Sequence, residues 1–387
     1  MTAKPVVIVG AGLAAWTTVR ELRKLDPAVP VTLVTADSGD FYAKPTLSNA
    51  LGQQRSPDQL VTTPAAAMAE SLQVTLQTRT RVQAIDAVAR TVGTTSGDLA
   101  FRDLVLANGA LPIRVPVGGD AAGRVLSINS LDDFSVFHAA LHRGSDAGLR
   151  SKRVVIMGAG LIGCEFANDL VAAGHVVTVV DPSARPLSAL MPSDASTRLR
   201  DALGGMGVQW HFGQTVAEVQ QAHADLRVTL SGGQTLTADL VLSAVGLRAD
   251  TSLARAAGAD CDRGVLVDAQ LKTSLDHVYA LGDVAQYQAA GNRTLPYVMP
   301  IMQAAKTLAA HLAGQAAALT FPLMPVAVKT PALPITVAPP PPGVGGNWQS
   351  DEVDVWRYVD LQGQQRGFVL VGSQTRQRMA QTKMTLM

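Results

Sequence analysis

The chain has 387 residues, of which 47% are hydrophobic, so it is long enough for two or three domains with buried cores. Thirty-two basic and thirty-one acidic residues give a formal net charge of +1, which offers no overall attraction for nucleic acid or an anionic membrane. The two cysteines, Cys164 and Cys261, are far apart and form no C-x-x-C pair, which excludes a disulfide framework and a cysteine metal cluster.

The sequence contains no segment that we expect to target or anchor the chain. Its first apolar run begins at Val6, which leaves no room for an export signal. The apolar stretch 316–328 is short and is interrupted by Pro322 and Pro325. We therefore expect a cytoplasmic protein without membrane insertion, a metal site or a nucleic-acid partner.

The first predicted unit opens with a glycine-rich turn between a strand at 6–9 and a helix at 13–25. The turn reads Gly10-Ala11-Gly12-Leu13-Ala14-Ala15. In this pattern the first glycine permits a tight turn, the second lets the backbone approach a pyrophosphate, and the third position must be small so that the helix packs closely. The helix start directs unpaired N–H groups at the phosphates. We therefore expect this turn to bind a dinucleotide.

Two further strands complete the first unit. The strand at 31–35 is rich in β-branched residues, and Thr35 and Asp37 at its end are candidates for binding a ribose, although either could be an ordinary loop residue. The spacing does not choose between them. A buried strand at 103–106 then runs into the small residues Ala107, Asn108, Gly109 and Ala110.

The same pattern returns 148 residues later as Gly158-Ala159-Gly160-Leu161-Ile162-Gly163, between a strand at 154–157 and a helix at 162–173. The next strand, 176–180, ends at Asp181, 23 residues after Gly158. A carboxylate at this offset accepts a hydrogen bond from a ribose 2'-hydroxyl and repels a 2'-phosphate, which favours NADH over NADPH. The alternative is that an Asp before a proline only forms a turn. A closing strand at 239–244 leads to Val245 and Gly246.

The chain after Gly246 returns to the first unit, with a strand at 279–281 and a helix at 302–313, and beyond Pro322 it forms a small separate sheet with strands at 353–358 and 367–371. This order predicts an α/β fold with two Rossmann-like dinucleotide-binding domains and a small C-terminal α+β domain. The first domain comprises 1–115 and 245–322, the second 116–244 and the third 323–387. Two nucleotides bound side by side are what hydride transfer from a nicotinamide to a flavin requires.

Several segments resemble a known family. Four of them resemble segments of the FAD-dependent pyridine nucleotide oxidoreductases, together with the paired glycine-rich turns. This family has a glutathione-reductase-like architecture that binds two nucleotides. The four segments are Phe41–Ser48, Leu106–Ala110, Leu161–Asp169 and Tyr279–Asp283. Those that resemble the rubredoxin-NAD reductase subfamily are Tyr297–Pro300, Val328–Pro334 and the prolines 339–341. The resemblance spans nearly the whole chain.

The resemblance implies FAD in the first unit and NADH in the second. It implies that Asp283 holds the ribityl or diphosphate part of the flavin, that Val82 contacts the adenine through its backbone, and that Val298 and Lys329 line the isoalloxazine. The full set of FAD candidates is Gly10, Gly12, Leu13, Ala14, Ala15, Thr35, Asp37, Lys44, Pro45, Val82, Ala107, Asn108, Gly109, Glu165, Asp283, Val298 and Lys329. The NAD candidates are Gly158, Gly160, Leu161, Ile162, Gly163, Asp181, Val245 and Gly246.

The resemblance also places Lys44 and Glu165 together beside flavin N5 as the catalytic pair. A lysine held there by a glutamate would stabilise the negative charge that a hydride brings to the ring, and each charge would compensate the other in the cleft. Taken alone, Lys44 could be an ordinary surface lysine. Glu165 could be a favourable charge near the start of a helix.

The absence of a cysteine pair indicates where the electrons go next. Cys164 stands alone at the start of an apolar helix, where a small buried thiol that fills space is the better interpretation. Reduced flavin must then pass electrons to an external one-electron carrier, and an iron protein such as rubredoxin fits. Such carriers are usually acidic, and the end of the chain provides the basic residues Arg366, Arg376, Arg378 and Lys383, which Arg248, Arg293 and Lys306 could join.

We therefore predict an NADH:rubredoxin oxidoreductase that feeds electrons to alkane hydroxylation or to reduction of oxygen or nitric oxide. A ferredoxin reductase of an oxygenase system is the first alternative, because it would share the two-nucleotide core. The second alternative is a flavoprotein that binds FAD and NADH to control an interaction without turnover.

Overall fold

The computed structural model describes residues 4–143 and 151–386, apart from the side chain of Asp351. The chain divides into two compact units. The first comprises Met1–Lys44, Val61–Leu111 and Leu247–Pro322, and the second comprises Pro45–Leu60, Pro112–Gly246 and Leu323–Met387. Residues 1–3, 144–150 and 387 of the three predicted domains lie outside the described residues.

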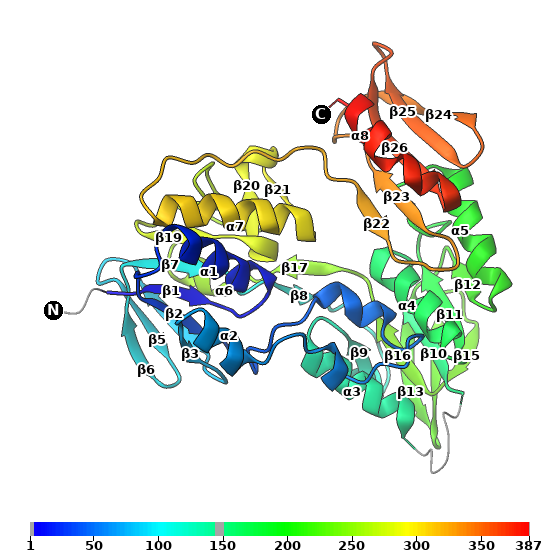
Figure 1. Ribbon diagram of the computed structural model, residues 1–387. Coiled ribbons are helices and arrows are strands. Elements are labelled where there is room, and N and C mark those ends of the chain that lie inside the picture. The colour runs from blue at the N-terminus through cyan, green and yellow to red at the C-terminus, as the bar shows by residue number, and fades with distance from the viewer. Residues whose placement is uncertain (1–3, 144–150, 387) are drawn as a thin grey trace. The chain divides into compact units, whose positions relative to one another are not determined.

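Unit 1 is built on a five-stranded parallel sheet (Figure 1). In spatial order its strands are β19 (Val278–Ala280), β7 (Asp103–Leu106), β1 (Val6–Val9), β2 (Val31–Val34) and β3 (Thr75–Gln77). Every residue of β1, β2, β7 and β19 is buried, as expected for a parallel sheet that is covered on both faces. Helices α1 (Leu13–Leu25) and α7 (Val298–Leu312) lie side by side against it.

The smaller elements of unit 1 surround this sheet. An antiparallel sheet contains β4 (Val82–Asp86), β5 (Thr91–Thr94) and β6 (Gly97–Ala100). Another sheet contains β18 (Val265–Val267), β20 (Ala285–Tyr287) and β21 (Arg293–Thr294). Unit 1 also contains the short elements α2 (Ala65–Ser71), β17 (Leu247–Ala249), α6 (Ser252–Ala256), η4 (Gly282–Val284) and η5 (Gln288–Ala290), and most of β8 (Ala110–Pro112).

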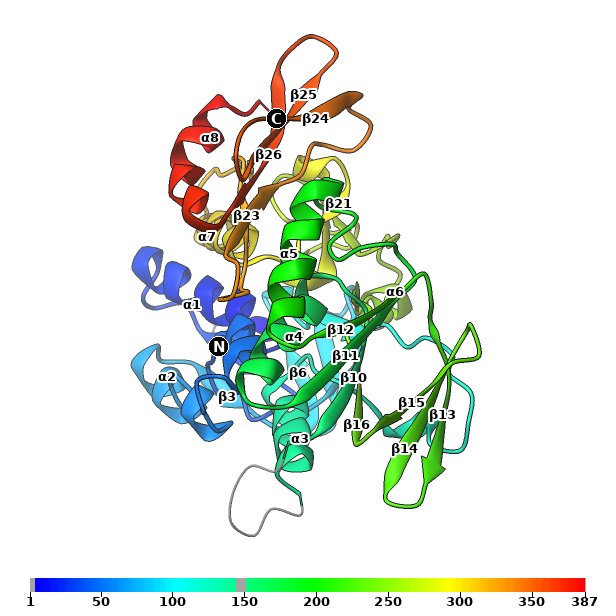
Figure 2. The same cartoon turned by 90° about the vertical axis from the view of Figure 1, so that its right-hand side faces the viewer.

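Unit 2 repeats this plan. Its parallel sheet has the order β12 (Gln209–Phe212), β11 (Val176–Asp181), β10 (Arg153–Met157), β16 (Leu240–Ser243) and β9 (Val125–Ser127). The helices are α3 (Leu131–His142), α4 (Leu161–Ala172) and α5 (Ser193–Gly205), and the antiparallel strands are β13 (Val216–Ala222), β14 (Asp225–Leu230) and β15 (Thr235–Ala238). Figure 2 shows α4 and α5 on one side of the parallel sheet and the antiparallel strands on the other.

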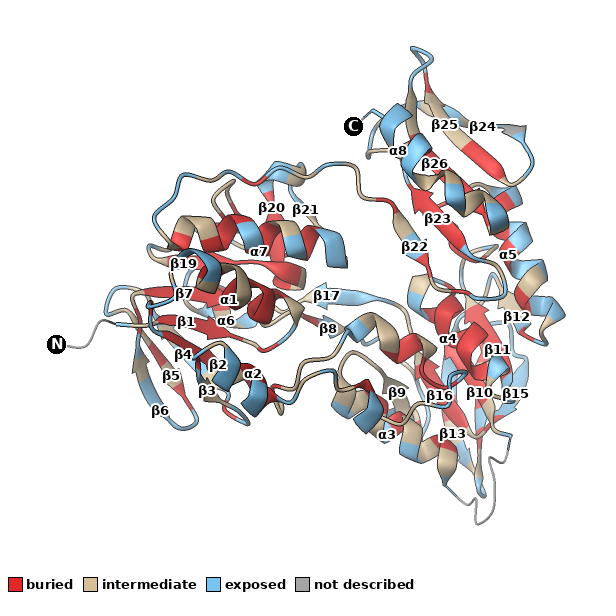
Figure 3. Ribbon diagram, viewed as in Figure 1, coloured by how far each residue is buried: buried red, intermediate tan, exposed pale blue. Residues whose placement is uncertain are grey.

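The C-terminal part of unit 2 forms its own antiparallel sheet. The strand order is β22 (Val326–Val328), β23 (Ile335–Ala338), β26 (Gln365–Val371), β25 (Val355–Asp360) and β24 (Gly346–Glu352). The 3-10 helix η6 (Gly372–Gln377) and helix α8 (Arg378–Met384) follow β26. As Figure 3 shows, β23 and β26 carry most of the buried residues of this sheet.

The predicted fold class is confirmed, and the main elements differ from their predicted ranges by only a few residues. Two differences concern the site. Helix α7 begins at Val298, four residues before the predicted start, because Pro300 lies in the first turn of the helix, where proline is tolerated. Residues 45–60 group with unit 2, although the sequence assigned them to the first domain. Among the described residues, we find no helix that is both long and apolar enough to cross a bilayer.

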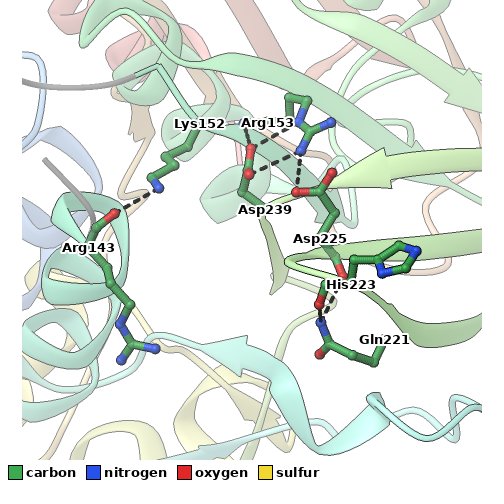
Figure 4. Close-up of polar contacts among 7 residues, drawn as sticks. All are labelled: Arg143, Lys152, Arg153, Gln221, His223, Asp225 and Asp239. Carbon is green, nitrogen blue, oxygen red and sulfur yellow. Dashed lines mark hydrogen bonds and ion pairs between the residues drawn. The ribbon is translucent and has the colours of Figure 1, made fainter.

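An arginine fork ties the antiparallel strands of unit 2 to its parallel sheet (Figure 4). The Arg153 side chain at the start of β10 donates from Nε to Asp239 Oδ2 at 3.0 Å and from Nη2 to Asp239 Oδ1 at 3.1 Å. The same Nη2 lies 2.8 Å from Asp225 Oδ1 at the start of β14. The hydrogen bonds from Arg153 hold the pKa of Asp239 below its ordinary value.

We predict that Arg153→Gln lowers the free energy of unfolding by about 1–2 kcal/mol at pH 7, because two carboxylates lose a charged donor while both remain partly exposed. The pKa of Asp239 is lower in the folded chain than its ordinary 3.8. The contribution is therefore present above pH 3.8 and is lost as the pH falls through the folded-state value. In urea unfolding measurements, the loss of unfolding free energy in Arg153→Gln relative to the wild type should therefore be smaller at pH 3 than at pH 7. Arg200→Gln, at an exposed arginine on α5, is the control, and an equal loss in both variants would contradict the assignment.

Candidate functional site

Each glycine-rich turn is pressed against the end of a neighbouring strand. Gly10 has φ +107° and Gly158 has φ +105°, a backbone conformation that favours glycine. A Cβ atom on Gly10 would lie 2.4 Å from the carbonyl oxygen of Ala107, and one on Gly158 would lie 2.7 Å from that of Ala244. Both turns therefore require glycine, and both lie where the parallel strands of their sheet end.

The next glycine of each turn faces open space. Gly12 and Gly160 are the N-cap residues of α1 and α4, both are exposed, and neither helix has a side-chain cap. A Cβ atom on either glycine would meet no atom within 4 Å among the described residues. The first N–H groups of each helix thus point into a cradle that a pyrophosphate fits, because helix starts favour anions. The geometry fits one dinucleotide in each unit.

The remaining candidates of unit 1 follow the ends of its strands. Ala107, Asn108 and Gly109 follow β7, and Gly282 and Asp283 follow β19. The Asn108 side chain donates to the carbonyl oxygen of Asp250 at 2.9 Å, and its buried Oδ1 has no hydrogen-bond partner among the described residues. A Cβ atom on Gly282 would lie 3.0 Å from Cβ of Ala14, so the β19 end closely approaches the start of α1. These groups surround the first cradle.

Asp283, three residues after Ala280 at the end of β19, is half-buried. Burial raises its pKa, and the positive charge of Lys44 opposes that rise. Lys44 begins the 3-10 helix η1 (Lys44–Asn49) and is exposed. Thr35 donates to Asp37 Oδ1 at 2.6 Å, so the two ribose candidates share one turn after β2. Val82 begins β4, and Val298, at the start of α7, is 41% exposed.

The second cradle contains the predicted NAD residues of unit 2. Leu161 and Ile162 form the first turn of α4, where Ile162 is 42% exposed, and Gly163 packs so tightly that a Cβ atom would lie 2.0 Å from the carbonyl oxygen of Gly158. Val245 and Gly246 follow the end of β16.

Asp181, at the end of β11, accepts a hydrogen bond from Ala159 N at 2.6 Å and another from Ser183 N at 2.7 Å. Its carboxylate therefore holds the glycine-rich turn and also forms the turn that the sequence left as an alternative. Its role in ribose binding stays a prediction.

Glu165, on α4, is the centre of a buried polar network in unit 2. Its Oε2 accepts from Ser48 Oγ at 2.6 Å and from Lys329 Nζ at 2.6 Å, and its Oε1 accepts from the backbone N–H of Lys329 at 3.0 Å. Lys329 Nζ also donates to the carbonyl oxygen of Pro45 at 2.6 Å and to Ser48 Oγ at 3.2 Å. All three donors of the ammonium group thus have acceptors within the protein.

Two more polar side chains of α4 extend this network. Asp169 accepts from the backbone N–H groups of Leu51 at 2.9 Å and Gly52 at 2.8 Å, and Asn168 accepts from Ala332 N at 3.1 Å. Burial raises the pKa of Asp169, against the opposing effects of these N–H groups and of Lys329. Through these hydrogen bonds, Glu165, Asn168 and Asp169 hold residues 45–52 and 329–332 against helix α4.

Pro45, Glu165 and Lys329 were all predicted from the sequence as FAD-binding residues, and the structure brings these three together in the Glu165 network. The pairing of Lys44 with Glu165 stays a prediction. Ser48, Asn168 and Asp169 were not among the site residues predicted from the sequence. The signal for Asn168 and Asp169 was their position three and four residues after Glu165 in an otherwise apolar helix start, a spacing that places the three side chains on one face.

Cys164 has a packing role in this structure. It is fully buried, its Sγ lies 3.4 Å from the carbonyl oxygen of Ala159, and burial raises the pKa of its thiol strongly. A thiol in this setting is a poor nucleophile. Neither Cys164 nor Cys261 is in a disulfide.

The fold and its two cradles agree with comparisons to known proteins. Residues 4–310 match the family model of the pyridine nucleotide-disulphide oxidoreductases, and residues 318–385 match that of the rubredoxin binding C-terminal domain. The first match covers most of the chain, so the protein belongs to the pyridine nucleotide-disulphide oxidoreductase family.

The chain is also similar to individual proteins of this family. It is 41% identical to a rubredoxin-NAD(+) reductase of Acinetobacter baylyi, over 98% of this chain and 97% of the relative, which confirms the resemblance seen in the motifs. It is 38% identical to a nitric oxide reductase FlRd-NAD(+) reductase of Pectobacterium atrosepticum, over 97% and 96%. A crystal structure of a ferredoxin reductase from Rhodopseudomonas palustris has a TM-score of 0.86 at 25% identity, over 99% and 96% of the two chains.

We predict that Asp181→Asn lowers the preference for NADH over NADPH about tenfold, because the amide no longer repels a 2'-phosphate while its oxygen can still accept one of the two backbone hydrogen bonds. The ratio of kcat/KM for the two coenzymes, with ferricyanide as the electron acceptor, measures the preference. Asp194→Asn, at an exposed position of α5, is the matched control. An unchanged ratio would show that Asp181 only stabilises the turn and does not select the coenzyme.

Proposed function

We propose that this protein is an NADH-dependent flavoprotein that reduces rubredoxin. The observation that carries the proposal is the pair of uncapped helix starts, Gly12 and Gly160, each facing open space at the end of a parallel sheet. Two such cradles fit two dinucleotides. The relatives named rubredoxin-NAD(+) reductase, and the match of residues 318–385, support rubredoxin as the acceptor.

The cradle of unit 1 would hold FAD. The N–H groups at the start of α1 would bind its diphosphate, and Asp283, Asn108 and the turn at Thr35 and Asp37 would contact its polar parts. FAD, when bound, accepts a hydride and releases electrons one at a time. The cradle of unit 2 would bind NADH reversibly, with Asp181 selecting the unphosphorylated ribose. We place the protein in the cytoplasm.

Charge at the flavin would come from Glu165, Lys329 and Lys44. The Glu165 carboxylate is buried, and Lys329 compensates it through two of the hydrogen bonds described above. We propose that Glu165 also orients Lys44, so that positive charge is in place before the hydride arrives.

Lys44→Ala and Glu165→Ala should therefore slow flavin reduction by NADH in stopped-flow measurements, and wild-type rates in both would contradict this role.

The identity of the acceptor separates the candidate functions. The similarity to a ferredoxin reductase structure at 25% identity favours ferredoxin as the second candidate. The higher identity to the rubredoxin-NAD(+) reductases, 41% over nearly the whole chain, favours rubredoxin. The absence of a second cysteine near Cys164 in the sequence leaves no internal dithiol there as an alternative acceptor.

An anaerobic stopped-flow experiment tests the proposal. NADH should bleach the flavin absorbance rapidly, NADPH should do so much more slowly, and oxidised rubredoxin should restore the absorbance faster than a [2Fe-2S] ferredoxin or oxygen. Faster reoxidation by ferredoxin would support the second candidate. Slow reduction by NADH, with a persistent charge-transfer band, would instead indicate a protein that binds both nucleotides without turnover.

A further inference from the structure

Tyr287, the last residue of β20, is completely buried, and its hydroxyl group bonds to the turn that follows β19. The hydroxyl oxygen accepts a hydrogen bond from the backbone N–H of Gly282 at 2.8 Å, and the hydroxyl group donates to the carbonyl oxygen of Gly282 at 3.3 Å. Gly282 is itself buried. A single hydroxyl group therefore satisfies both backbone polar groups of a buried glycine, which would be costly to leave without partners.

The ring of Tyr287 is held by packing. It belongs to the hydrophobic core of unit 1 and lies edge-on to the ring of Phe321, with centroids 5.2 Å apart and planes at 80°. Burial raises the pKa of the hydroxyl group, so that it stays protonated and able to donate at neutral pH. The core therefore fixes the ring, and the ring presents the hydroxyl group to Gly282.

Gly282 is also confined by the start of α1. Its φ of +81° lies in the left-handed region that favours glycine, and a Cβ atom there would lie 3.0 Å from Cβ of Ala14. Ala14 belongs to the first turn of α1, whose N–H groups form the first cradle. The backbone of Gly282 therefore closely approaches the cradle helix and is hydrogen-bonded to Tyr287 at the same time.

The bond to the Gly282 carbonyl group acts on the next residue, Asp283. The carbonyl group of Gly282 and the N–H group of Asp283 belong to one planar peptide unit. A hydrogen bond that fixes the carbonyl oxygen therefore fixes the plane from which the Asp283 residue begins. The hydroxyl group of Tyr287 thus constrains where the Asp283 carboxylate can lie.

We propose that Tyr287 is a positioning residue of the FAD site, which acts by fixing the peptide unit between Gly282 and Asp283. This inference rests on the proposed function, which puts FAD in the first cradle with Asp283 against a polar part of it. In this role Tyr287 acts on the cofactor only through Asp283. Because the carboxylate is held in place before FAD binds, less conformational freedom is lost on binding.

The rate of FAD release from the holoenzyme, followed as the gain of flavin fluorescence after dilution, tests the proposal. Tyr287→Phe keeps the ring and removes the hydroxyl group, so FAD release should become about tenfold faster, as expected for the loss of a buried hydrogen-bond partner. Tyr279→Phe is the matched control. It removes the hydroxyl group of another buried tyrosine of unit 1, which lies 3.3 Å from His311 Nε2, and it should release FAD like the wild type.

A double-mutant cycle with Asp283→Ala separates positioning from a general effect on the fold. If Tyr287 acts through Asp283, Tyr287→Phe should change the release rate less than twofold once Asp283→Ala is present. Should a variant be isolated without FAD, titration with FAD gives the same cycle as a ratio of Kd values. A tenfold effect of Tyr287→Phe in both backgrounds, or a single variant within twofold of the wild type, would overturn the proposal.

The wild type tests the proposed function separately. A wild type that holds no FAD, or whose FAD is not reduced by NADH, would overturn the proposed function and this inference with it. A wild type that holds FAD and is reduced by NADH, together with additive effects of Tyr287→Phe and Asp283→Ala, would overturn only the role of Tyr287.

Discussion

The buried carboxylate of Glu165 connects three parts of the chain that are remote in sequence. It accepts hydrogen bonds from Ser48 and from both the backbone and the side chain of Lys329. A carboxylate removed from water is costly unless charge and hydrogen bonds compensate it, so these partners are required and not incidental. This constraint explains why residues 45–60 group with unit 2, and why β22 and the turn after it lie beside α4.

The two glycine-rich turns share one design but differ in detail. Both use an initial glycine with positive φ against a strand end, and both leave the second glycine open at a helix start. The third position is Ala15 in one copy and Gly163 in the other, where a Cβ atom would overlap the carbonyl oxygen of Gly158. The second turn also has Asp181 fixed to its backbone. The copies therefore differ in how closely the helix packs on the turn and in whether a side chain holds the turn.

The fold could be predicted from the sequence because its signals are local. Continuous β-branched strands followed by glycine-rich turns specify parallel strands and helix starts within a few residues. The Lys329 contacts could not be predicted by the same reasoning, because they join residues 164 positions apart and depend on how the helix face is oriented. Arg366 counted as part of a basic patch in the sequence because its pairing with Asp360 depends on how the hairpin of β25 and β26 folds.

A double-mutant cycle between Glu165 and Lys329 tests the central claim most directly. The free energy of urea unfolding would be measured for the wild type, Glu165→Gln, Lys329→Met and the double variant. If the carboxylate organises this region through the lysine, the coupling free energy should be about 1–3 kcal/mol, since paired charges in contact are not additive. Additive effects within about 0.3 kcal/mol would show that the two residues contribute independently and would contradict the account.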